Sequence, residues 1–505
     1  MRKKYFTGIA TRWAMMMAVA AGLLALACNK LTESPGSVVV SSQFYKTSAD
    51  AVAAVTAAYS SLNSDPAGDF PIYGRNLNLL VENASDNQVY SPSNTNPDVR
   101  ALGTVTYVSS NDRLHKLWQQ HYFGISRANV AIDNIPLIPA AQFADTTLQT
   151  RLVREAKFIR ALLYFNLVRL FGAVPLVLHD PTTVDVNALK IGRTSADGVY
   201  AQIISDLGDA TRLPATYSGA NIGRVTSGAA HTLLAKVYVA RRDWTDAQAE
   251  LQTVISSGAY GLFPHFRDVF QRPTKNGIEH IFSVQFESNL GAVNSTQFLS
   301  ESFSSFNPSV WPIDVPADSS VSQLFSGTDT RGAVTFYNTQ YNAATGQTVV
   351  YKNAYTPYLN KFVDYSLSPL SNQSKSGVNY PVLRYAEVLL LESEVLNELN
   401  GPSAPAYIAI NQVRERAGIG DLPVGLSQGD FRDSVFLERR REFIQEGQRW
   451  FDLVHQGGTA LYDALNAIAA KRVANGGGAA LKDTLFPIPL TEIQLNSQLT
   501  QNPGW

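Results

Sequence analysis

The chain has 505 residues, of which 45% are hydrophobic and 16% charged, and its formal net charge is −1. This hydrophobic content is typical of a globular protein and excludes a disordered one. The balanced charge argues against a nucleic-acid-binding surface. Charged residues are fewer than the usual quarter, so Ser, Thr, Asn, Gln and Tyr supply much of the polarity, which favours neutral polar ligands such as sugars.

The amino-terminal segment has the pattern of a secretory signal that ends at a lipidation site. Residues 1–12 carry four basic side chains, residues 13–27 carry no charge, and the only cysteine is Cys28. A single thiol cannot form an internal disulfide, so we interpret Cys28 as an acyl acceptor. A chance cysteine after an ordinary signal is the alternative. We therefore predict removal of residues 1–27, lipid attachment at Cys28, a tether over residues 28–43 and a single domain over residues 28–505.

Apolar residues at alternating spacings of 3 and 4 predict a series of helices. The first begins near Thr47 and Ser48, which are N-cap candidates, and the third ends at Gly172. The predicted helices cover residues 48–62, 114–135, 152–170, 195–213 and 226–257, the last range as two helices.

Residues 226–257 have the pattern of a tetratricopeptide-like helix pair. Ala235 and Ala247 are small enough to let two helices approach, and Trp244 and Leu251 would fill the groove between them. Residues 383–400 and 404–417 form a second candidate pair. The sequence thus predicts a mainly α fold, in which a helical scaffold with tetratricopeptide-like pairs carries long irregular loops and a few short strands.

Two long segments, residues 64–110 and 287–380, break the helical pattern. Both are rich in proline, asparagine and aromatic residues, and alternating residues over 278–286 predict a strand beside the second. Long segments without regular structure usually carry function.

Aromatic and short polar side chains in these two segments are the candidate ligand contacts. Sugar rings stack their C–H faces on Trp and Tyr, while Asn, Asp and Arg bind the hydroxyl groups. The predicted ligand-binding residues are Arg75, Asp86, Asn87, Tyr90, Tyr107 and Trp311. Further aromatic candidates are Tyr73, Phe306, Tyr337 and Tyr341. For each aromatic residue the alternative is that it packs its own loop.

The densest cluster of charges surrounds three glutamates at i, i+4 and i+8, namely Glu438, Glu442 and Glu446. A glycoside hydrolase would use two such carboxylates as acid and base on either side of an open cleft. The arginines at 439–441 and 449 would instead hold the pKa of each carboxyl low, which is the opposite of what a general acid needs. We therefore predict a structural network.

Motifs for metals and cofactors are missing from the sequence. The 7 histidines do not pair at i+3 or i+4, and no HExxH, P-loop or Rossmann glycine pattern occurs. We expect no zinc site and no cofactor, while an isolated calcium site in the irregular region stays open.

Several motifs occur in order along nearly the whole mature chain. They include EAKFIRA at 155–161, FGAVPL at 171–176, GRVT at 223–226, YPVLRYAEV at 380–388, the charged run at 438–453, FPIP at 486–489 and QNPGW at 501–505. Together they resemble the SusD/RagB family of outer-membrane nutrient-binding lipoproteins. The resemblance implies a SusD-like helical fold, a lipid anchor on the outer membrane of a Gram-negative bacterium, and a SusC-type TonB-dependent transporter as partner.

These inferences predict a non-enzymatic, surface-exposed lipoprotein that captures an oligosaccharide or polysaccharide and delivers it to the transporter. Capture of peptides, as in the RagB branch of the family, is the first alternative. A secreted glycoside hydrolase and a purely structural tetratricopeptide adaptor are the others.

Overall fold

The computed structural model of the chain is mainly α-helical, with short strands, which confirms the predicted fold class. The described residues are 44–65, 67–92, 94–181, 185–287, 314–342, 345–352, 357–367, 376–469 and 484–505. Thr47–Trp505 forms one compact unit. The predicted signal, Cys28, Phe306 and Trp311 lie outside the described residues.

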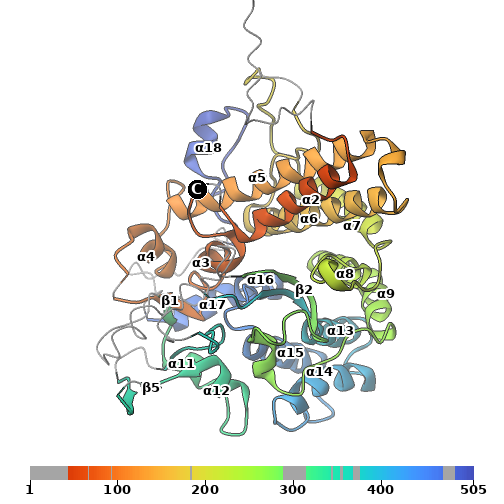
Figure 1. Ribbon diagram of the computed structural model, residues 1–505. Helices are drawn as coiled ribbons and strands as arrows, with labels where there is room; N and C mark the ends of the chain where they lie inside the picture. The colour runs from red at the N-terminus through yellow and green to blue at the C-terminus, as the bar shows by residue number, and fades with distance from the viewer. Residues whose placement is uncertain are drawn as a thin grey trace, which may run out of the picture. The chain divides into compact units, whose positions relative to one another are not determined.

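Four long helices pack in succession at one side of this unit: α2 (Ser48–Asn63), α5 (Asp112–Asn134), α6 (Leu148–Phe171) and α7 (Ala196–Ala210) (Figure 1). Their termini follow from local chemistry. Thr47 and Asp50 form a capping box at the start of α2, and the Asn111 side chain accepts the first free N–H groups of α5. Gly172, with φ of 70°, ends α6 where the sequence predicts it.

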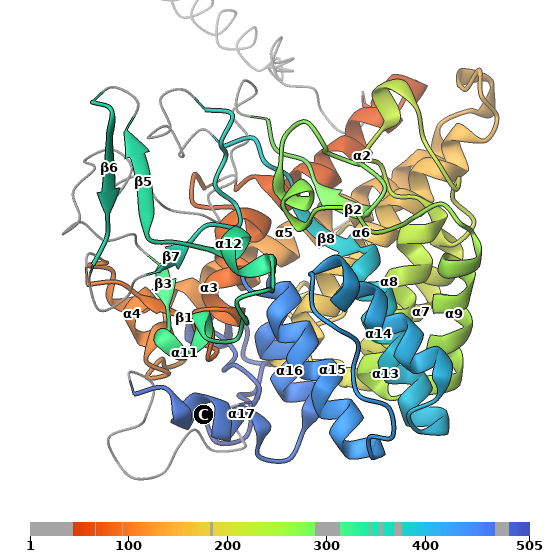
Figure 2. The same cartoon turned by 90° about the horizontal axis from the view of Figure 1, so that it is seen from below.

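The two predicted helical hairpins are present. The first consists of α8 (Ser227–Arg241) and α9 (Trp244–Ser256), and the second of α13 (Tyr385–Asn400) and α14 (Ala404–Arg416). Helix α9 also packs on α13, so the hairpins lie side by side (Figure 2). They are followed by α15 (Gln428–Phe443), α16 (Arg449–Gln456) and α17 (Ala460–Ala467).

The remaining elements are short. The helices are η1 (Ile72–Asn76), α3 (Leu77–Val81), α4 (Pro97–Gly103), η2 (Ile135–Leu137), η3 (Ala140–Gln142), η4 (Gly219–Asn221), η5 (Phe266–Phe270), α11 (Ser319–Ser322), α12 (Arg331–Thr335) and α18 (Leu490–Leu495). The strands are β1 (Gln88–Tyr90), β2 (His280–Val284), β3 (Asp314–Pro316), β4 (Phe336–Tyr337), β5 (Thr339–Asn342), β6 (Gln347–Val350), β7 (Tyr358–Leu359) and β8 (Tyr380–Arg384). Over the described parts of the chain, no helix has the length and apolar character that a membrane crossing requires.

The strands form antiparallel pairs, and one pair joins the two irregular segments. Strand β1 pairs with β3, with Gln88 opposite Pro316 and Tyr90 opposite Asp314. The other pairs are β2 with β8, β4 with β7, and β5 with β6. The two irregular segments, 64–110 and 287–380, therefore contribute to one lobe. Its described elements include β1, β3, α4, α11 and the strands β4 to β7 (Figure 2).

Part of this lobe differs from the expectation of an exposed ligand loop. Every residue from 71 to 89 is buried, over η1, α3 and the start of β1. Its polar side chains bind remote backbone: Asn78 donates to the Gln445 carbonyl at 2.8 Å, and Glu82 accepts the Gly447 N–H at 2.9 Å. The lack of a helical pattern here reflects a polar interior, because buried polar groups must find partners.

Candidate functional site

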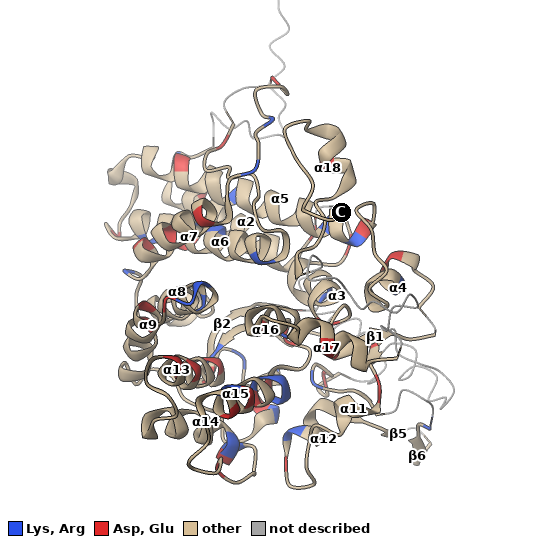
Figure 3. Cartoon of the chain, turned by 180° about the vertical axis from the view of Figure 1, so that it is seen from behind, with Lys and Arg blue, Asp and Glu red and all other residues tan. Residues whose placement is uncertain are grey.

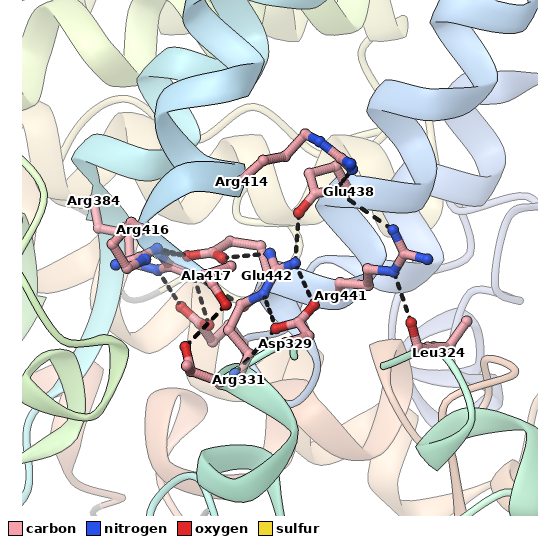
Figure 4. A network of polar contacts seen from close by, with 12 residues as sticks. Leu324, Asp329, Arg331, Arg384, Arg414, Arg416, Ala417, Glu438, Arg441 and Glu442 are labelled. Carbon is pink, nitrogen blue, oxygen red and sulfur yellow. Dashed lines mark hydrogen bonds and ion pairs between the residues drawn. The ribbon is translucent and has the colours of Figure 1, made fainter. Parts of the chain in front are cut away.

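The three glutamates of the charged run lie in the interior. Figure 4 shows Glu438 and Glu442 with the arginines that surround them. Glu438, Glu442 and Glu446 are at most 3% exposed. Arg384 donates to Glu442 at 2.6 Å and to Glu446 at 2.7 Å. Arg331 pairs with Glu438 at 2.6 Å and with Glu442 at 2.9 Å. This network connects α15 with β8 and α12.

Electrostatics favour a structural role for Glu442. Burial alone would raise the pKa of Glu442, but Arg416, Arg384 and Arg331 together hold that pKa well below its ordinary value. A carboxyl that stays ionised and has no access to solvent cannot donate a proton to a glycosidic oxygen. Glu442 is therefore a buried structural carboxylate and not a general acid.

Two predicted ligand contacts, Asp86 and Asn87, extend this interior. Asp86 accepts two hydrogen bonds from Arg449, at 2.7 and 2.9 Å, and pairs with Arg440 at 2.9 Å. Burial would raise the pKa of Asp86, yet Arg449 and Arg440 lower it to about 2. Asn87 accepts from Arg440 at 3.0 Å and donates to Glu82 at 3.1 Å. Both side chains are therefore committed to the protein itself.

Arg75 and Tyr107 are also interior residues. Arg75 forms an ion pair with Asp314 and lies over the Phe70 ring, 5.4 Å from its centroid. The Tyr107 ring lies 5.1 Å from that of Phe486 and 5.5 Å from that of Trp505. Neither residue is more than 4% exposed, so neither offers a surface to a ligand. Arg75 holds the two irregular segments together and Tyr107 packs in the interior, which is the alternative stated for each aromatic residue.

Tyr90 differs, because its side chain is only half-buried. It lies opposite Asp314 in the β1–β3 pair and therefore next to the partner of Arg75. The Arg100 guanidinium of α4 lies 4.8 Å from the Tyr90 ring centroid, a cation–π contact that the sequence pattern did not predict.

Tyr90 and Tyr337 both pack on a buried cluster of Val89, Val315, Tyr351 and Tyr358. The ring centroids of Tyr337, Tyr351 and Tyr358 are 5.2 to 6.0 Å apart, which is the range of favourable aromatic pairs. Tyr337 is half-buried, as Tyr90 is, whereas Tyr351 and Tyr358 lie beneath them. Two partly exposed rings thus have a rigid aromatic support.

The β5–β6 hairpin adds the most exposed ring among the described residues of the lobe. Tyr341 is 63% exposed and lies opposite Thr348. We call Tyr90, Arg100, Tyr337 and Tyr341 the lobe surface. It offers aromatic faces and hydroxyl groups together with the Arg100 guanidinium, and Figure 3 shows how sparse and mixed the charged residues are along the described ribbon. Among the described residues, no group of three or more His, Cys, Asp or Glu is placed to hold a metal ion.

Comparison with known proteins identifies the fold that carries this surface. Residues 41–239 match a family model described as "Starch-binding associating with outer membrane", and residues 289–505 match the model of the SusD family. The chain belongs to the SusD family. The resemblance found in its motifs is therefore confirmed.

Relatives in the SusD family align along nearly their whole length. The SusD-like protein P2 of Formosa agariphila is 28% identical, and the match covers 96% of this chain and 98% of that protein. The crystal structure of a SusD homolog from Bacteroides thetaiotaomicron has 26% identity and a TM-score of 0.78, covering 92% of this chain and 98% of that one. A laminarin binding SusD-like protein has 26% identity and a TM-score of 0.74, covering 91% and 100%.

Proposed function

We propose that this SusD-family chain is a non-enzymatic, glycan-binding lipoprotein of the outer-membrane surface. The observation that carries the proposal is the alignment with a laminarin binding SusD-like protein over 91% of this chain. The lobe surface supports it, because exposed and partly exposed tyrosine rings suit stacking on sugar rings.

Binding at the lobe surface would be the sum of several weak contacts. Tyr341 offers an open ring face, and Tyr90 and Tyr337 offer partly open faces above a packed support. A glycan of several units can contact more than one ring, which raises its affinity through effective concentration. An acyl chain at Cys28 would confine the protein to the membrane and add to the same effect.

The proposed absence of catalysis rests on the charged network. The carboxylates with the spacing of an acid–base pair, Glu438, Glu442 and Glu446, are buried and paired with arginines. The chain would therefore deliver its glycan intact to a SusC-type TonB-dependent transporter, which supplies the energy for uptake.

Glycan binding is tested by calorimetry of the soluble protein from residue 44 onward against laminarin, starch and a tryptic peptide pool. We expect Tyr341→Ala to weaken binding of one glycan by about 5- to 150-fold, which corresponds to about 1–3 kcal/mol for a lost stacking ring. Leu137→Ala, which removes a 76% exposed side chain outside the lobe, is the matched control and should change nothing. Binding of the peptide pool alone would support the RagB-like alternative, and glycan affinity that survives both Tyr341→Ala and Tyr337→Ala would refute the lobe surface.

The proposed partner is tested in the membrane. An affinity tag on this chain should recover a SusC-type transporter in mild detergent from the native cells. Recovery of the chain alone, with the transporter present in the same membranes, would count against the complex.

A further inference from the structure

Arg100 is an exposed cation of the lobe surface, and its charge is not compensated by any described carboxylate. Its guanidinium contacts the Tyr90 ring, but its side chain forms no hydrogen bond or ion pair with the described residues. Asp98 lies two positions earlier on α4, and side chains at that spacing do not face each other. Asp314, opposite Tyr90 in the β1–β3 pair, is already paired with Arg75. The N–H donors of Arg100 are therefore available to a ligand.

The position of Arg100 follows from the close packing of α4 on β1. A Cβ atom on Gly103 would lie 2.8 Å from Cδ1 of Tyr90 and 3.2 Å from its backbone nitrogen, so this approach requires a glycine. Gly103 and Arg100 are three residues apart and share a face of α4. The Asn96 side chain caps the start of this helix, and Leu102 is fully buried beneath it. The guanidinium is therefore held against the Tyr90 ring before any ligand arrives.

The lobe exposes positive charge but buries its negative charge. Its described residues lie within 86–103 and 314–367. Among them no carboxylate is exposed, because Asp98 and Asp318 are half-buried and the others are buried. The exposed charges are Arg100 and Lys352, and neither forms an ion pair with the described chain. Such a surface is electrostatically complementary to an anionic ligand.

We propose that the lobe surface selects a glycan with an anionic sugar unit, and that Arg100 binds its carboxylate or sulfate group. This inference rests on the glycan binding proposed above and adds the class of glycan. A planar guanidinium can donate two parallel N–H bonds to a carboxylate, and a sulfate ester presents oxygens to the same donors. A neutral sugar unit gains only ordinary hydrogen bonds from Arg100. The difference in affinity between anionic and neutral forms of one glycan is therefore the quantity that Arg100 determines.

The test compares matched glycans by calorimetry with the full chain in detergent. Laminarin, soluble starch and galactan are each measured in neutral form, after oxidation of their primary hydroxyl groups to carboxylates, and after sulfation. These forms share a backbone, so they present the same sugar faces to the tyrosines. We expect an anionic form of at least one backbone to bind about fivefold or more tightly than its neutral form. Salt at about 0.5 M should reduce this preference by screening it.

Substitutions at Arg100 assign the preference to this side chain. Arg100→Gln should abolish it and leave the affinity for the neutral form within about twofold of the wild type. Arg100→Lys keeps the charge without the planar donors and should retain part of the preference. Arg212→Gln is the matched control, because it removes a 64% exposed cation outside the lobe and should keep the full preference. Thermal melting of each variant establishes that it is folded.

Failure of this inference can be told apart from failure of the proposed function. If neutral forms bind at least as tightly as their anionic forms, glycan binding stands and selection of an anionic unit is overturned. If the preference survives Arg100→Gln, or disappears only in Lys352→Gln, the role of Arg100 is overturned. If no form of any backbone binds to the wild type, glycan binding at the lobe surface is refuted together with this inference.

Discussion

Arg75 and Asp314, 239 residues apart in sequence, form an ion pair whose side chains are only 5% and 9% exposed. Arg75 belongs to the first irregular segment, and Asp314 belongs to the second, where it is the first residue of β3. Asn83 donates to the same carboxylate at 3.0 Å. This pair fixes the two segments that support the lobe surface.

Breaking this pair from one side should destabilise the fold. We expect Asp314→Ala to lower the free energy of unfolding by about 3–5 kcal/mol, because it leaves a buried guanidinium without its partner. The double variant Arg75→Met with Asp314→Leu should lose less than the sum of the single variants in urea denaturation. Asp197→Ala, which breaks the exposed pair with Arg241, is the control and should cost less than about 1 kcal/mol. Strict additivity at Arg75 and Asp314 would contradict the coupling.

Tyr107 should behave as a packing residue. Tyr107→Ala removes a ring that lies against Phe486 and Trp505, and we expect a loss of about 3–5 kcal/mol of stability. Tyr107→Phe keeps the ring and should retain most of that stability. Calorimetry on the folded fraction should show unchanged glycan affinity for both variants. A fall in affinity without a fall in melting temperature would restore Tyr107 as a ligand contact.

Glu442 should contribute to stability and not to hydrolysis. Glu442→Ala leaves Arg331, Arg384 and Arg416 without a shared carboxylate, at an expected cost of about 3–5 kcal/mol. The exposed Glu415 provides the control variant, Glu415→Ala, which should melt as the wild type does. Reducing-sugar assays should detect no glycan hydrolysis by any of these proteins. Hydrolysis by the wild type that disappears in Glu442→Ala would overturn the non-enzymatic function.

Glu82 should make stability depend on pH near neutrality. Burial raises its pKa from 4.5 to about 7. The N–H groups of Asn87, Gln448 and Gly447 lower this pKa, but their effect is smaller than that of burial. The folded state therefore keeps a proton that the unfolded chain loses at lower pH, so this group's contribution to stability falls as pH rises from about 4.5 to 7. The loss amounts to about 3 kcal/mol when complete.

Glu82→Gln removes that titration. Urea denaturation at pH 5, 6, 7 and 8 should show a shallower fall in stability for Glu82→Gln than for the wild type. Glu415→Gln should keep the wild-type slope, because Glu415 is exposed. Equal slopes for Glu82→Gln and the wild type would show that Glu82 is already ionised at pH 5.

The predicted lipid anchor gives a test of localisation. Cys28→Ala should remove labelling by a radioactive fatty acid and release a folded, soluble protein from the membrane fraction. Equal labelling of wild type and variant would show that Cys28 is not the acylated residue.

The long helices could be predicted from sequence because their cause is local. In α5, Leu114, Trp118 and Ile125 recur on one face, and all three are buried where that face meets α2 and α6. Short polar residues in irregular segments are harder to interpret, because a ligand site and a buried network use the same residue types. Asp86 is an example: its partner Arg449 lies 363 residues away, and no local pattern relates them. The contact of Arg100 with Tyr90 likewise depends on how α4 packs against β1.

The wholly buried segment 71–89 can complete its hydrogen bonds only after the carboxy-terminal part of the chain has been synthesised. Glu82 accepts a hydrogen bond from the Gly447 N–H, which lies 365 residues later in the sequence. Asp86 accepts from Arg449, which lies 363 residues later. At about 5–20 residues per second, roughly 20–70 s separate the synthesis of these partners. Helices α5 and α6 contact each other across a short connection and can pack together within that interval. Segment 71–89 cannot be buried in that time, because its carboxy-terminal hydrogen-bond partners have not yet been synthesised. An amino-terminal half that stays incomplete until the carboxy-terminal half emerges suits passage through a secretion channel, which is the route that the predicted signal implies.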